Sequence, residues 1–327
     1  MRKKQLFIPL LLILMLVLGA CGGTNNDPAA GSGTSDQTYT IGLSLEALDH
    51  PYMITLKDQV IAAAEAYTDA KVSVIVTDGE KSVVQQANGI EDMLTRGIDI
   101  LMIQASTSEG LMEALASAEE QGVPYMFVGK PANGTNAVTM VNNDNFEIGK
   151  NVGEWVVKFL TEKNGSAKGN VAHISGIPGD KSSEDRTGGY VEATKAYPEI
   201  VLVSNVTGQY RRDAGLKAME DILQTKPVGT IDVLFAANGE EAIGAAQAVA
   251  DAGRKGEFPI LSIDGDKASI AEIKNGNLTV AWTYEPCGTA GFEYAMKILN
   301  GEDVPKQVII PSRQIDESNV DTAIPAF

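Results

Sequence analysis

The most constraining feature of this chain is the regular alternation of short runs rich in Val and Ile with longer amphipathic stretches. Strands that alternate with helices in this way are typical of βαβ units, in which parallel strands share one sheet. The sequence therefore predicts an α/β protein. We expect strands near residues 39–44, 72–77, 98–104, 124–128, 171–175, 200–204, 231–236, 259–263 and 278–284.

The segments between these strands carry apolar residues at helical spacing. Val83, Ala87, Ile90 and Leu94 recur at steps of four, three and four, which places them on one face of a helix. A helix with one apolar face packs that face against a sheet. We expect these residues to belong to the core.

The predicted strands fall into two groups, separated by a long helical stretch from Phe146 to Leu160. The chain beyond its amino-terminal segment has about 290 residues, more than a single core usually holds. We therefore expect two doubly wound parallel-sheet lobes joined by a multi-strand hinge. The predicted N-terminal lobe contains residues 39–143 and 285–311, the C-terminal lobe contains residues 144–284 and 312–327, and the crossings lie near residues 143–145, 284–286 and 311–312.

The first residues have the pattern of an export signal. Arg2, Lys3 and Lys4 precede an apolar run from residue 6 to residue 18, which is interrupted by Pro9. That run is shorter than the about 20 apolar residues that span a bilayer. We predict that residues 1–20 are a signal peptide and that the mature protein lies outside the cytoplasm.

The signal ends in a motif for lipid attachment. The sequence Leu18-Gly19-Ala20-Cys21 resembles the lipobox of bacterial lipoproteins, in which the cysteine is acylated and becomes the first mature residue. The following residues up to 38 are mostly Gly, Ser, Thr, Asn, Asp, Ala and Pro, a composition that cannot bury a core. We therefore expect residues 21–38 to be a lipid-anchored flexible tether at the cell membrane.

Charge and cysteine content exclude other classes of protein. The chain has 26 Lys and Arg residues against 43 Asp and Glu residues, with a formal net charge of −17, and such a surface repels nucleic acid. Cys287 is the only cysteine besides Cys21, so no intramolecular disulfide forms once Cys21 is acylated. We expect Cys287 to be buried, because an exposed thiol outside the cell is prone to oxidation.

Polar and aromatic residues follow the predicted strands. In open parallel sheets, ligands bind beyond the carboxyl ends of the strands. Any single residue there serves equally well as a helix cap or a solvated loop residue, and Asp266 is expected to be such a cap. As a set, we predict that the following residues bind a ligand: Asp49, Tyr52, Met53, Lys130, Arg186, Tyr210, Asn238, Asp264 and Tyr284.

The chemistry of this set suits a polyhydroxylated ligand. Arg, Asn and Asp side chains offer paired donors or acceptors that match neighbouring hydroxyl groups. Tyrosine rings cover the apolar C–H face of a sugar while its edge remains hydrogen-bonded. Tyr210 lies in a polar loop and suits this role, whereas Trp282 lies within a strand pattern and is expected in the core.

At these positions the sequence resembles the ribose- and galactose-type periplasmic binding proteins, the substrate receptors of ATP-driven sugar importers. The resemblance extends over residues 39–312. The stretch 233–245, Val-Leu-Phe-Ala-Ala-Asn-Gly-Glu-Glu-Ala-Ile-Gly-Ala, is similar to the family's strand that ends in a ligand-binding asparagine, here Asn238. Ser262-Ile-Asp-Gly265 carries the family's aspartate, here Asp264, and Arg186-Thr-Gly-Gly-Tyr190 resembles its arginine pattern. Tyr210 falls where the family stacks an aromatic ring on the sugar.

This resemblance implies a type I periplasmic-binding-protein fold whose lobes close over the ligand about the hinge. It also implies a monomer without cofactor that delivers its ligand to an ABC permease with a cytoplasmic ATPase. The alternative is a receptor that presents its ligand to a sensor kinase or chemoreceptor. The sequence does not separate these partners.

The chain departs from the family in its first loop, after the fourth strand and at the hinge. The first loop, Asp49-His50-Pro51-Tyr52-Met53, keeps the family's proline but only one of its aromatic residues. Gly129-Lys130 stands where ribose binders have Asp-Arg, so a carboxylate is lost and the cation is a point charge. Tyr284 replaces a hinge glutamine. These changes favour another pentose, a hexose, a cyclitol, or a ligand whose own carboxylate pairs with Lys130.

Two other classes of protein fit the sequence less well. The chain has no P-loop, nucleophile elbow or zinc-protease motif, so we do not expect an enzyme. His50 and His173 are its only histidines; we expect no metal site, and we expect His173 to be a hydrogen-bonded core residue. A sugar-responsive repressor needs an amino-terminal helix-turn-helix, where this chain has its export signal.

Overall fold

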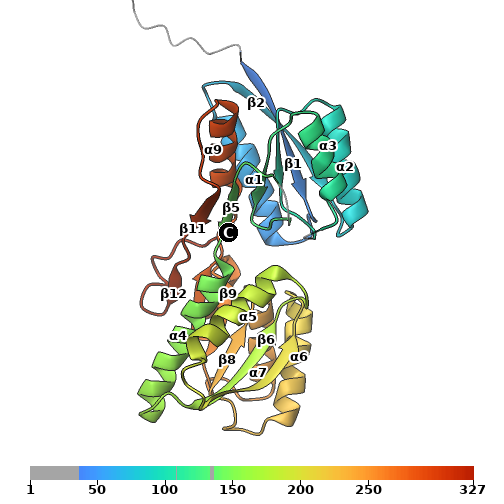
Figure 1. Cartoon of the computed structure of the whole chain (residues 1–327). Coiled ribbons are helices and arrows are strands. Elements are labelled where there is room, and N and C mark those ends of the chain that lie inside the picture. Colours follow the sequence, from blue (N-terminus) through green and yellow to red (C-terminus); the bar gives the residue numbers. More distant parts are fainter. Residues whose placement is uncertain (1–36, 108, 133–135) are drawn as a thin grey trace, which may run out of the picture. The chain divides into compact units, whose positions relative to one another are not determined.

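The computed structural model describes residues 37–107, 109–132 and 136–327 (Figure 1). The predicted signal peptide and Cys21 lie outside these residues, as does nearly all of the predicted tether. Within the described part of the chain, no helix combines the length and the apolar character that crossing a bilayer requires.

Two six-stranded sheets form the framework of the part of the chain that the structure describes. The first has the order β11-β5-β4-β3-β1-β2, and all its pairs are parallel. Its strands are β1 (Thr38–Leu45), β2 (Lys71–Asp78), β3 (Ile100–Ile103), β4 (Tyr125–Val128), β5 (Met140–Asn143) and β11 (Gln307–Ile310).

The second sheet has the order β12-β10-β9-β8-β6-β7. Its pairs are parallel except that β12 runs antiparallel to β10 at the edge. Its strands are β6 (Gly169–Ser175), β7 (Ile200–Thr207), β8 (Val233–Ala236), β9 (Ile260–Asp264), β10 (Val280–Thr283) and β12 (Gln314–Asp316).

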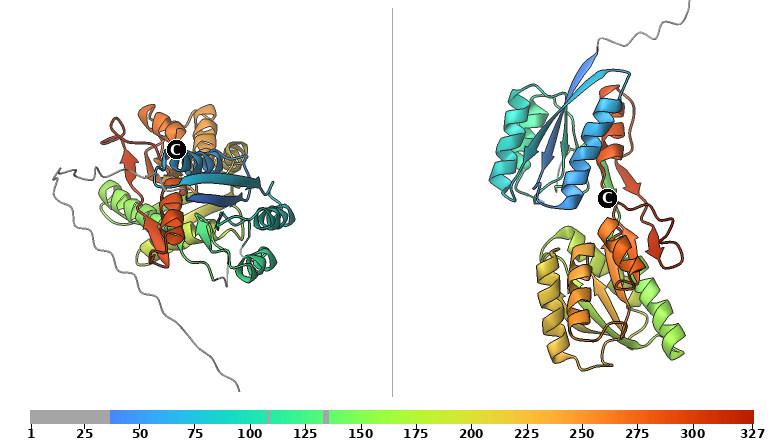
Figure 2. Two further views of the ribbon diagram at one scale, coloured as in Figure 1. Left: turned by 90° about the horizontal axis from the view of Figure 1, so that it is seen from above. Right: turned by 180° about the vertical axis from the view of Figure 1, so that it is seen from behind.

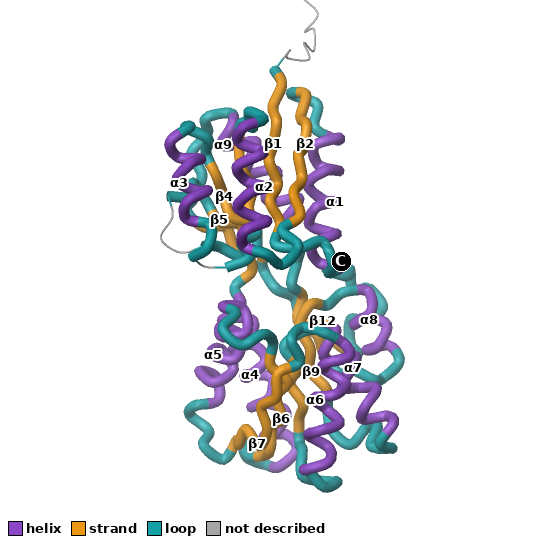
Figure 3. Tube along the Cα trace, turned by 90° about the vertical axis from the view of Figure 1, so that its right-hand side faces the viewer, coloured by secondary structure: helices purple, strands orange, loops and turns teal. Residues whose placement is uncertain are grey.

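Helices cover both faces of each sheet (Figures 2 and 3). On the first sheet, α1 (Pro51–Ala66) and α9 (Gly288–Leu299) pack on one face, and α2 (Val83–Thr95) and α3 (Met112–Glu120) pack on the other. On the second sheet, one face carries α4 (Asn145–Asn164) and α5 (Lys181–Thr194), and the other carries α6 (Arg212–Thr225), α7 (Gly239–Asp251) and α8 (Lys267–Lys274).

This layering follows from strand geometry, because successive side chains point to opposite faces of a sheet. In β3, Ile100 and Met102 join the core under α1 and α9, whereas Leu101 and Ile103 join the core under α2 and α3. A strand that is buried on both faces must be apolar throughout, which is why these strands are continuous Val/Ile/Leu runs in the sequence.

The predicted fold of two doubly wound lobes is confirmed, and each predicted strand is present with ends displaced by a few residues. The sequence did not predict β5, β11 or β12. These strands have three or four residues each, and β5 ends in Asn142 and Asn143. β12, which was not predicted, is an antiparallel edge strand of the second sheet.

The chain passes from one sheet to the other at three places among the described residues. These are the link from β5 to α4, the link from β10 to α9, and the link from β11 to β12. The lobe limits given above, 39–143 with 285–311 and 144–284 with 312–327, remain a prediction.

Glycines allow α4 and α5 to pack backbone against backbone. A Cβ atom on Gly149 of α4 would lie 2.0 Å from the Arg186 carbonyl oxygen, and one on Gly189 of α5 would lie 2.0 Å from the Phe146 carbonyl oxygen. No side chain fits at either position. This contact fixes the position of α5 along α4, and therefore the position of Arg186.

We expect Gly149→Ala to destabilise the protein by about 1–3 kcal/mol, because the added methyl group forces the two helices apart. Urea unfolding of the variant measures this loss. The control is Gly188→Ala on α5, whose Cβ would meet only ring atoms of Phe146 at 3.6 Å. It should be neutral or stabilising, since Ala favours helix over Gly. Equal effects of the two changes would contradict the packing argument.

Candidate ligand-binding site

A buried arginine lies at the centre of the predicted group. Arg186 on α5 is only 3% exposed. Its Nε donates to Oδ1 of Asn145 at 2.9 Å, and one terminal nitrogen donates to the Ala237 carbonyl oxygen at 2.6 Å. The guanidinium thus joins the first residue of α4 to the end of β8. Asn145 was not predicted as a site residue.

Asn238 follows β8, and Asp264 is the last residue of β9. Asn238 caps α7: its Oδ1 accepts from the Glu241 backbone N–H at 2.9 Å. Asp264 is 6% exposed, and its Oδ2 accepts from the Gly239 backbone N–H at 3.1 Å. Burial raises the pKa of Asp264 to about 7, although Arg186 opposes the shift. Near neutral pH this carboxyl group is therefore available both as donor and as acceptor.

Tyr210 reaches the same place from the loop after β7. Its ring centroid lies 5.8 Å from the Arg186 guanidinium, and its hydroxyl donates to Oδ1 of Asp180 at 3.0 Å. A Cβ on Gly176 would lie 2.3 Å from the ring. Only glycine at position 176 lets the tyrosine lie against the backbone after β6.

The Tyr210 turn rests on a buried carboxyl group that the sequence analysis missed. Gln209 and Tyr210 both have positive φ, 54° and 58°. Oε1 of Glu241 accepts from the Tyr210 backbone N–H at 2.7 Å, while Oε2 is buried and has no hydrogen-bond partner among the described residues. Burial raises the pKa of Glu241 to about 8. Glu241 is one of two adjacent glutamates in the first turn of α7, and nothing in the sequence there indicates this contact.

Lys130, which follows β4, lies between two carboxylates. Its Nζ is 2.7 Å from Oε2 of Glu46 after β1, and 3.4 Å from Oδ2 of Asp180 at the start of α5. Burial works to lower the pKa of Lys130, but the two carboxylates outweigh it and raise that pKa. Burial raises the pKa of Glu46, with Lys130 opposing. Neither Glu46 nor Asp180 was predicted.

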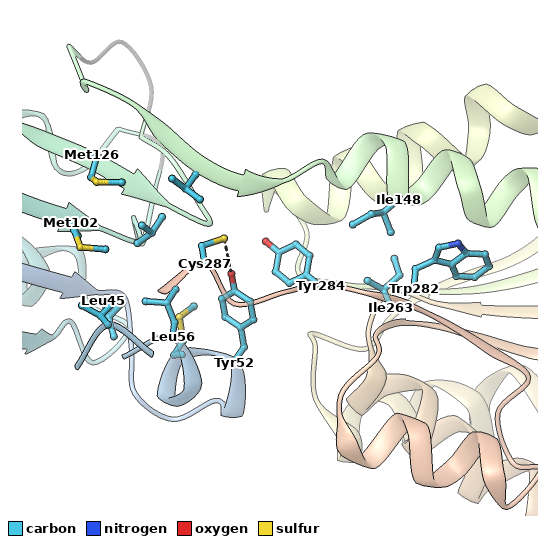
Figure 4. Packing of buried hydrophobic residues seen from close by; sticks show 14 of the residues in the cluster. Leu45, Tyr52, Leu56, Met102, Met126, Ile148, Ile263, Trp282, Tyr284 and Cys287 are labelled. Atoms are coloured by element: carbon cyan, nitrogen blue, oxygen red, sulfur yellow. Dashed lines mark hydrogen bonds between the residues drawn. The ribbon is translucent and has the colours of Figure 1, made fainter. Parts of the chain in front are cut away.

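Three residues connect this group to the hinge (Figure 4). The rings of Tyr52 and Tyr284 are 5.1 Å apart, and the Tyr284 ring centroid is 4.7 Å from the Arg186 guanidinium. The Tyr52 hydroxyl lies 3.8 Å from the Cys287 sulfur. Cys287 is buried, as predicted.

Gly129 explains how Tyr52 fits. Gly129 has a φ of 82°, and a Cβ there would lie 3.0 Å from the Tyr52 hydroxyl oxygen. The tyrosine hydroxyl therefore lies against the backbone at Gly129, where a side chain would crowd it.

Two predicted site residues do not join this group. Asp49 is exposed and forms an ion pair with Lys81 at the surface. Met53 is buried in the core under α1 and α9.

His50, the next residue after Asp49, is the N-cap of α1. Its Nδ1 accepts from the Tyr52 backbone N–H at 3.2 Å, whereas its buried Nε2 has no partner in the described part of the chain. Burial lowers the pKa of His50. The neutral ring therefore presents an N–H that is free to donate. The proline after His50 and the tyrosine after that were the available signals for this loop.

Three structural expectations are resolved. Asp266 caps α8 by accepting from the Ser269 backbone N–H at 3.0 Å, as predicted. Trp282 is buried in the core, also as predicted. The expectation for His173 was wrong in one respect: its ring stacks on Phe235, but its two nitrogens have no hydrogen-bond partner among the described residues. Burial lowers the pKa of His173 to about 4, so the ring is neutral.

The described residues contain no cluster of three or more His, Cys, Asp or Glu side chains that could hold a metal ion. Two hollows of about 350 and 480 Å³ lie by the second sheet, the first around Phe159 and Phe258 and the second around Trp155 and Trp282. None of the predicted ligand residues lines either hollow. We assign the site from the converging contacts instead, because they lie at the carboxyl ends of the strands.

We expect Glu241→Gln to change how stability depends on pH. The pKa of Glu241 is raised from 4.5 to about 8 in the folded protein, so the unfolded chain binds fewer protons in between and wild-type stability falls as pH rises through this window. Glutamine cannot ionise, so the free energy of unfolding of the variant should fall less over this range. The difference in slope should be up to about 1.4 kcal/mol per pH unit. Chemical denaturation of the empty protein over the same pH range measures it.

The control for this prediction is Glu192→Gln, since Glu192 pairs with Lys195 at the surface. It should follow the wild-type curve. If the Glu241→Gln curve also followed the wild type, the ionising group would have to be another residue.

Comparison with known proteins agrees with this geometry. A family model described as a periplasmic binding protein domain matches residues 41–303. The ribose import binding protein RbsB of Bacillus subtilis is 30% identical over 312 residues, covering 94% of this chain and 97% of that protein. The xylitol-binding protein of Mycolicibacterium smegmatis is 26% identical over 313 residues, covering 94% and 84%.

Solved structures show the same fold. A periplasmic solute-binding protein of an ABC transporter from Actinobacillus succinogenes, with bound D-allose, has a TM-score of 0.77 and 27% identity over 87% of this chain and 100% of that one. One from Bacillus halodurans, with bound myo-inositol, has a TM-score of 0.79 and 24% identity over 88% and 97%. The chain therefore belongs to the periplasmic binding protein family, in its ribose- and galactose-type group.

Proposed function

We propose that this protein is the extracytoplasmic substrate-binding protein of an ABC-type importer and that it binds a small polyhydroxylated solute. The observation that carries this proposal is the buried Arg186 guanidinium, which lies between the rings of Tyr210 and Tyr284. Around it, Asn238 and Asp264 supply further polar atoms from neighbouring strand ends.

The hydrogen-bonding capacity of this group suits vicinal hydroxyls. A guanidinium has five N–H donors, and Arg186 uses donors on two of its nitrogens for Asn145 and Ala237. The remaining donors, together with the Asp264 carboxyl group, match adjacent hydroxyl oxygens. Because hydroxyls both donate and accept, a carboxyl group with a pKa near 7 serves them in either state.

The aromatic rings supply the apolar half of the site. Tyr210 and Tyr284 lie beside the guanidinium, and Tyr52 lies beside Tyr284. Such rings bury the C–H face of a sugar or polyol at little entropic cost. The relatives named for ribose, xylitol and allose support this class of ligand, since all three compounds carry adjacent hydroxyls.

Binding is proposed to close the lobes about the three links between the sheets. The ion pair between Lys130 and Asp180 already joins the two sheets, because Lys130 follows a strand of the first and Asp180 follows a strand of the second. A ligand that contacts both sides shifts an equilibrium between open and closed forms, by an amount set by its preference for the closed form. The closed surface is then what a permease recognises.

The proposal extends to the protein's location and partners. We propose that Cys21 carries a lipid anchor, that the protein works as a monomer without cofactor or catalysis, and that it serves a permease with a cytoplasmic ATPase. Relatives that are import binding proteins support the importer over the alternative of a sensor-kinase or chemoreceptor ligand carrier.

We expect a thermal-shift screen of residues 22–327 to find the ligand class. D-ribose, D-allose, xylitol and myo-inositol are the probes. A bound solute at about 100 times its Kd stabilises the fold by about 2.7 kcal/mol, which raises the unfolding midpoint by several degrees.

Asp264→Asn should abolish that shift while the midpoint of the empty protein stays close to wild type. The amide still accepts from Gly239 but cannot supply a second carboxylate oxygen to the ligand. The control is Asp266→Asn, which keeps the α8 cap because Asn caps helices as well as Asp does. An Asp264→Asn protein that still responds to the same solute would exclude Asp264 from the site.

Cys21→Ser in the full chain should move the protein from the membrane fraction to the soluble fraction, because two acyl chains anchor a protein firmly and serine accepts none. Cell fractionation followed by detergent phase partitioning checks this. Cys287→Ala is the control and should stay with the membrane, since Cys287 is buried in the fold. Persistent membrane association of the Cys21→Ser protein would refute the anchor.

A further inference from the structure

We infer that Glu46 and Asp180 are specificity-determining residues, and that with Lys130 between them they restrict the site to solutes without negative charge. The inference rests on the proposed function and narrows its substrate class. Three side chains carry it, and they are called the charged triad below: Glu46, Lys130 and Asp180.

The charged triad is partly withdrawn from water. The side chains of Lys130, Glu46 and Asp180 are 18%, 25% and 14% exposed. The Lys130 ammonium is 2.7 Å from one carboxylate and 3.4 Å from the other. At such exposure the charges are screened less than surface charges, so they act strongly on a ligand.

The charged triad adjoins the other predicted ligand residues. Oδ1 of Asp180 accepts from the Tyr210 hydroxyl at 3.0 Å, and the Tyr210 ring lies beside Arg186. Glu46 and Lys130 each follow a strand of the first sheet, at the carboxyl ends where ligands bind. The charged triad therefore forms the side of the site that belongs to the first sheet, with Asp180 reaching it from α5.

The balance of charge decides what this side accepts. Lys130 is one cation shared by two carboxylates, so the charged triad has a net negative charge. A ligand carboxylate approaching Lys130 would meet both Glu46 and Asp180, and like charges in contact are strongly unfavourable. A ligand that pairs its own carboxylate with Lys130, which the sequence left open, is therefore disfavoured.

Neutral hydroxyls suit the same atoms. An ammonium has three N–H donors, and Lys130 directs them at one oxygen of Glu46 and one of Asp180, which leaves one for a ligand. The carboxylates retain lone pairs that accept from hydroxyl groups.

Each carboxylate also has a structural contact, which the test must separate from its effect on the ligand. Asp180 caps α5 by accepting from the Ser183 backbone N–H at 3.2 Å. Oε1 of Glu46 accepts from the Gln104 amide at 3.4 Å. Asp180→Asn and Glu46→Gln keep acceptor oxygens for these contacts and remove only the charge.

The experiment is isothermal titration calorimetry with matched neutral and acidic probes. The pairs are D-galactose with D-galacturonate and D-glucose with D-glucuronate, in which the acid keeps the pyranose ring of the neutral sugar. The wild-type protein should bind any neutral probe that it accepts more than about tenfold tighter than its acidic counterpart. In the double variant Glu46→Gln/Asp180→Asn, Lys130 is unpaired, and the preference should shrink by about tenfold or reverse.

The control is Glu192→Gln, which removes a charge from α5 at an exposed pair with Lys195. It should keep the wild-type preference. If the double variant does not fold, Asp180→Asn alone should show a smaller shift in the same direction.

The outcomes separate the two proposals. An acidic probe that the wild type binds as tightly as its neutral counterpart would overturn the charge selectivity and leave the solute-binding function standing. A preference that survives in the double variant would remove Glu46 and Asp180 as its source. If the protein bound none of these probes and none of the four solutes of the thermal-shift screen, the proposed function would fail, and this inference with it.

Discussion

The burial of one positive charge organises the predicted site. A guanidinium withdrawn from water is stable only when hydrogen bonds and nearby negative or aromatic groups replace its hydration. Arg186 obtains these from the start of α4, the end of β8 and the rings of Tyr210 and Tyr284. Satisfying this one side chain therefore draws together segments that are far apart in the sequence, and the glycine contact between α4 and α5 sets where it lies.

Around Arg186 the protein arranges carboxyl groups in two different environments. Asp264 and Glu241 are buried, so their pKa values rise and each group gains or loses its proton near neutral pH. Glu46 and Asp180 share the ammonium of Lys130. Asp264 suits hydroxyls, which both donate and accept, whereas Glu241 supports the Tyr210 turn, and the second pair opposes an entering anion. Together these environments fit a neutral, hydroxyl-rich solute.

Much of the fold was predictable because its signals are local. Parallel strands buried on both faces must be apolar throughout, and runs such as Ile100–Ile103 show this directly. The short strands β5, β11 and β12 gave no such signal, because they owe their conformation to neighbouring strands. In the site, Arg186, Tyr210, Asn238 and Asp264 were predictable from their place after strands. Asp49 instead lies at the surface, because α1 begins after His50 and it is the His50 side chain that caps the helix.

The sequence by itself determined the alternation of strands and helices, the two lobes and most of the polar residues at strand ends, because each depends on short-range pattern or on position after a strand. Only the tertiary structure decided that Glu46 and Asp180 meet Lys130 and that Glu241 supports Tyr210. These contacts join residues that are 31 to 84 positions apart in the sequence. The register of the packed strands and helices brings them together. No local pattern encodes such a distance, so it emerges only when the sheets form.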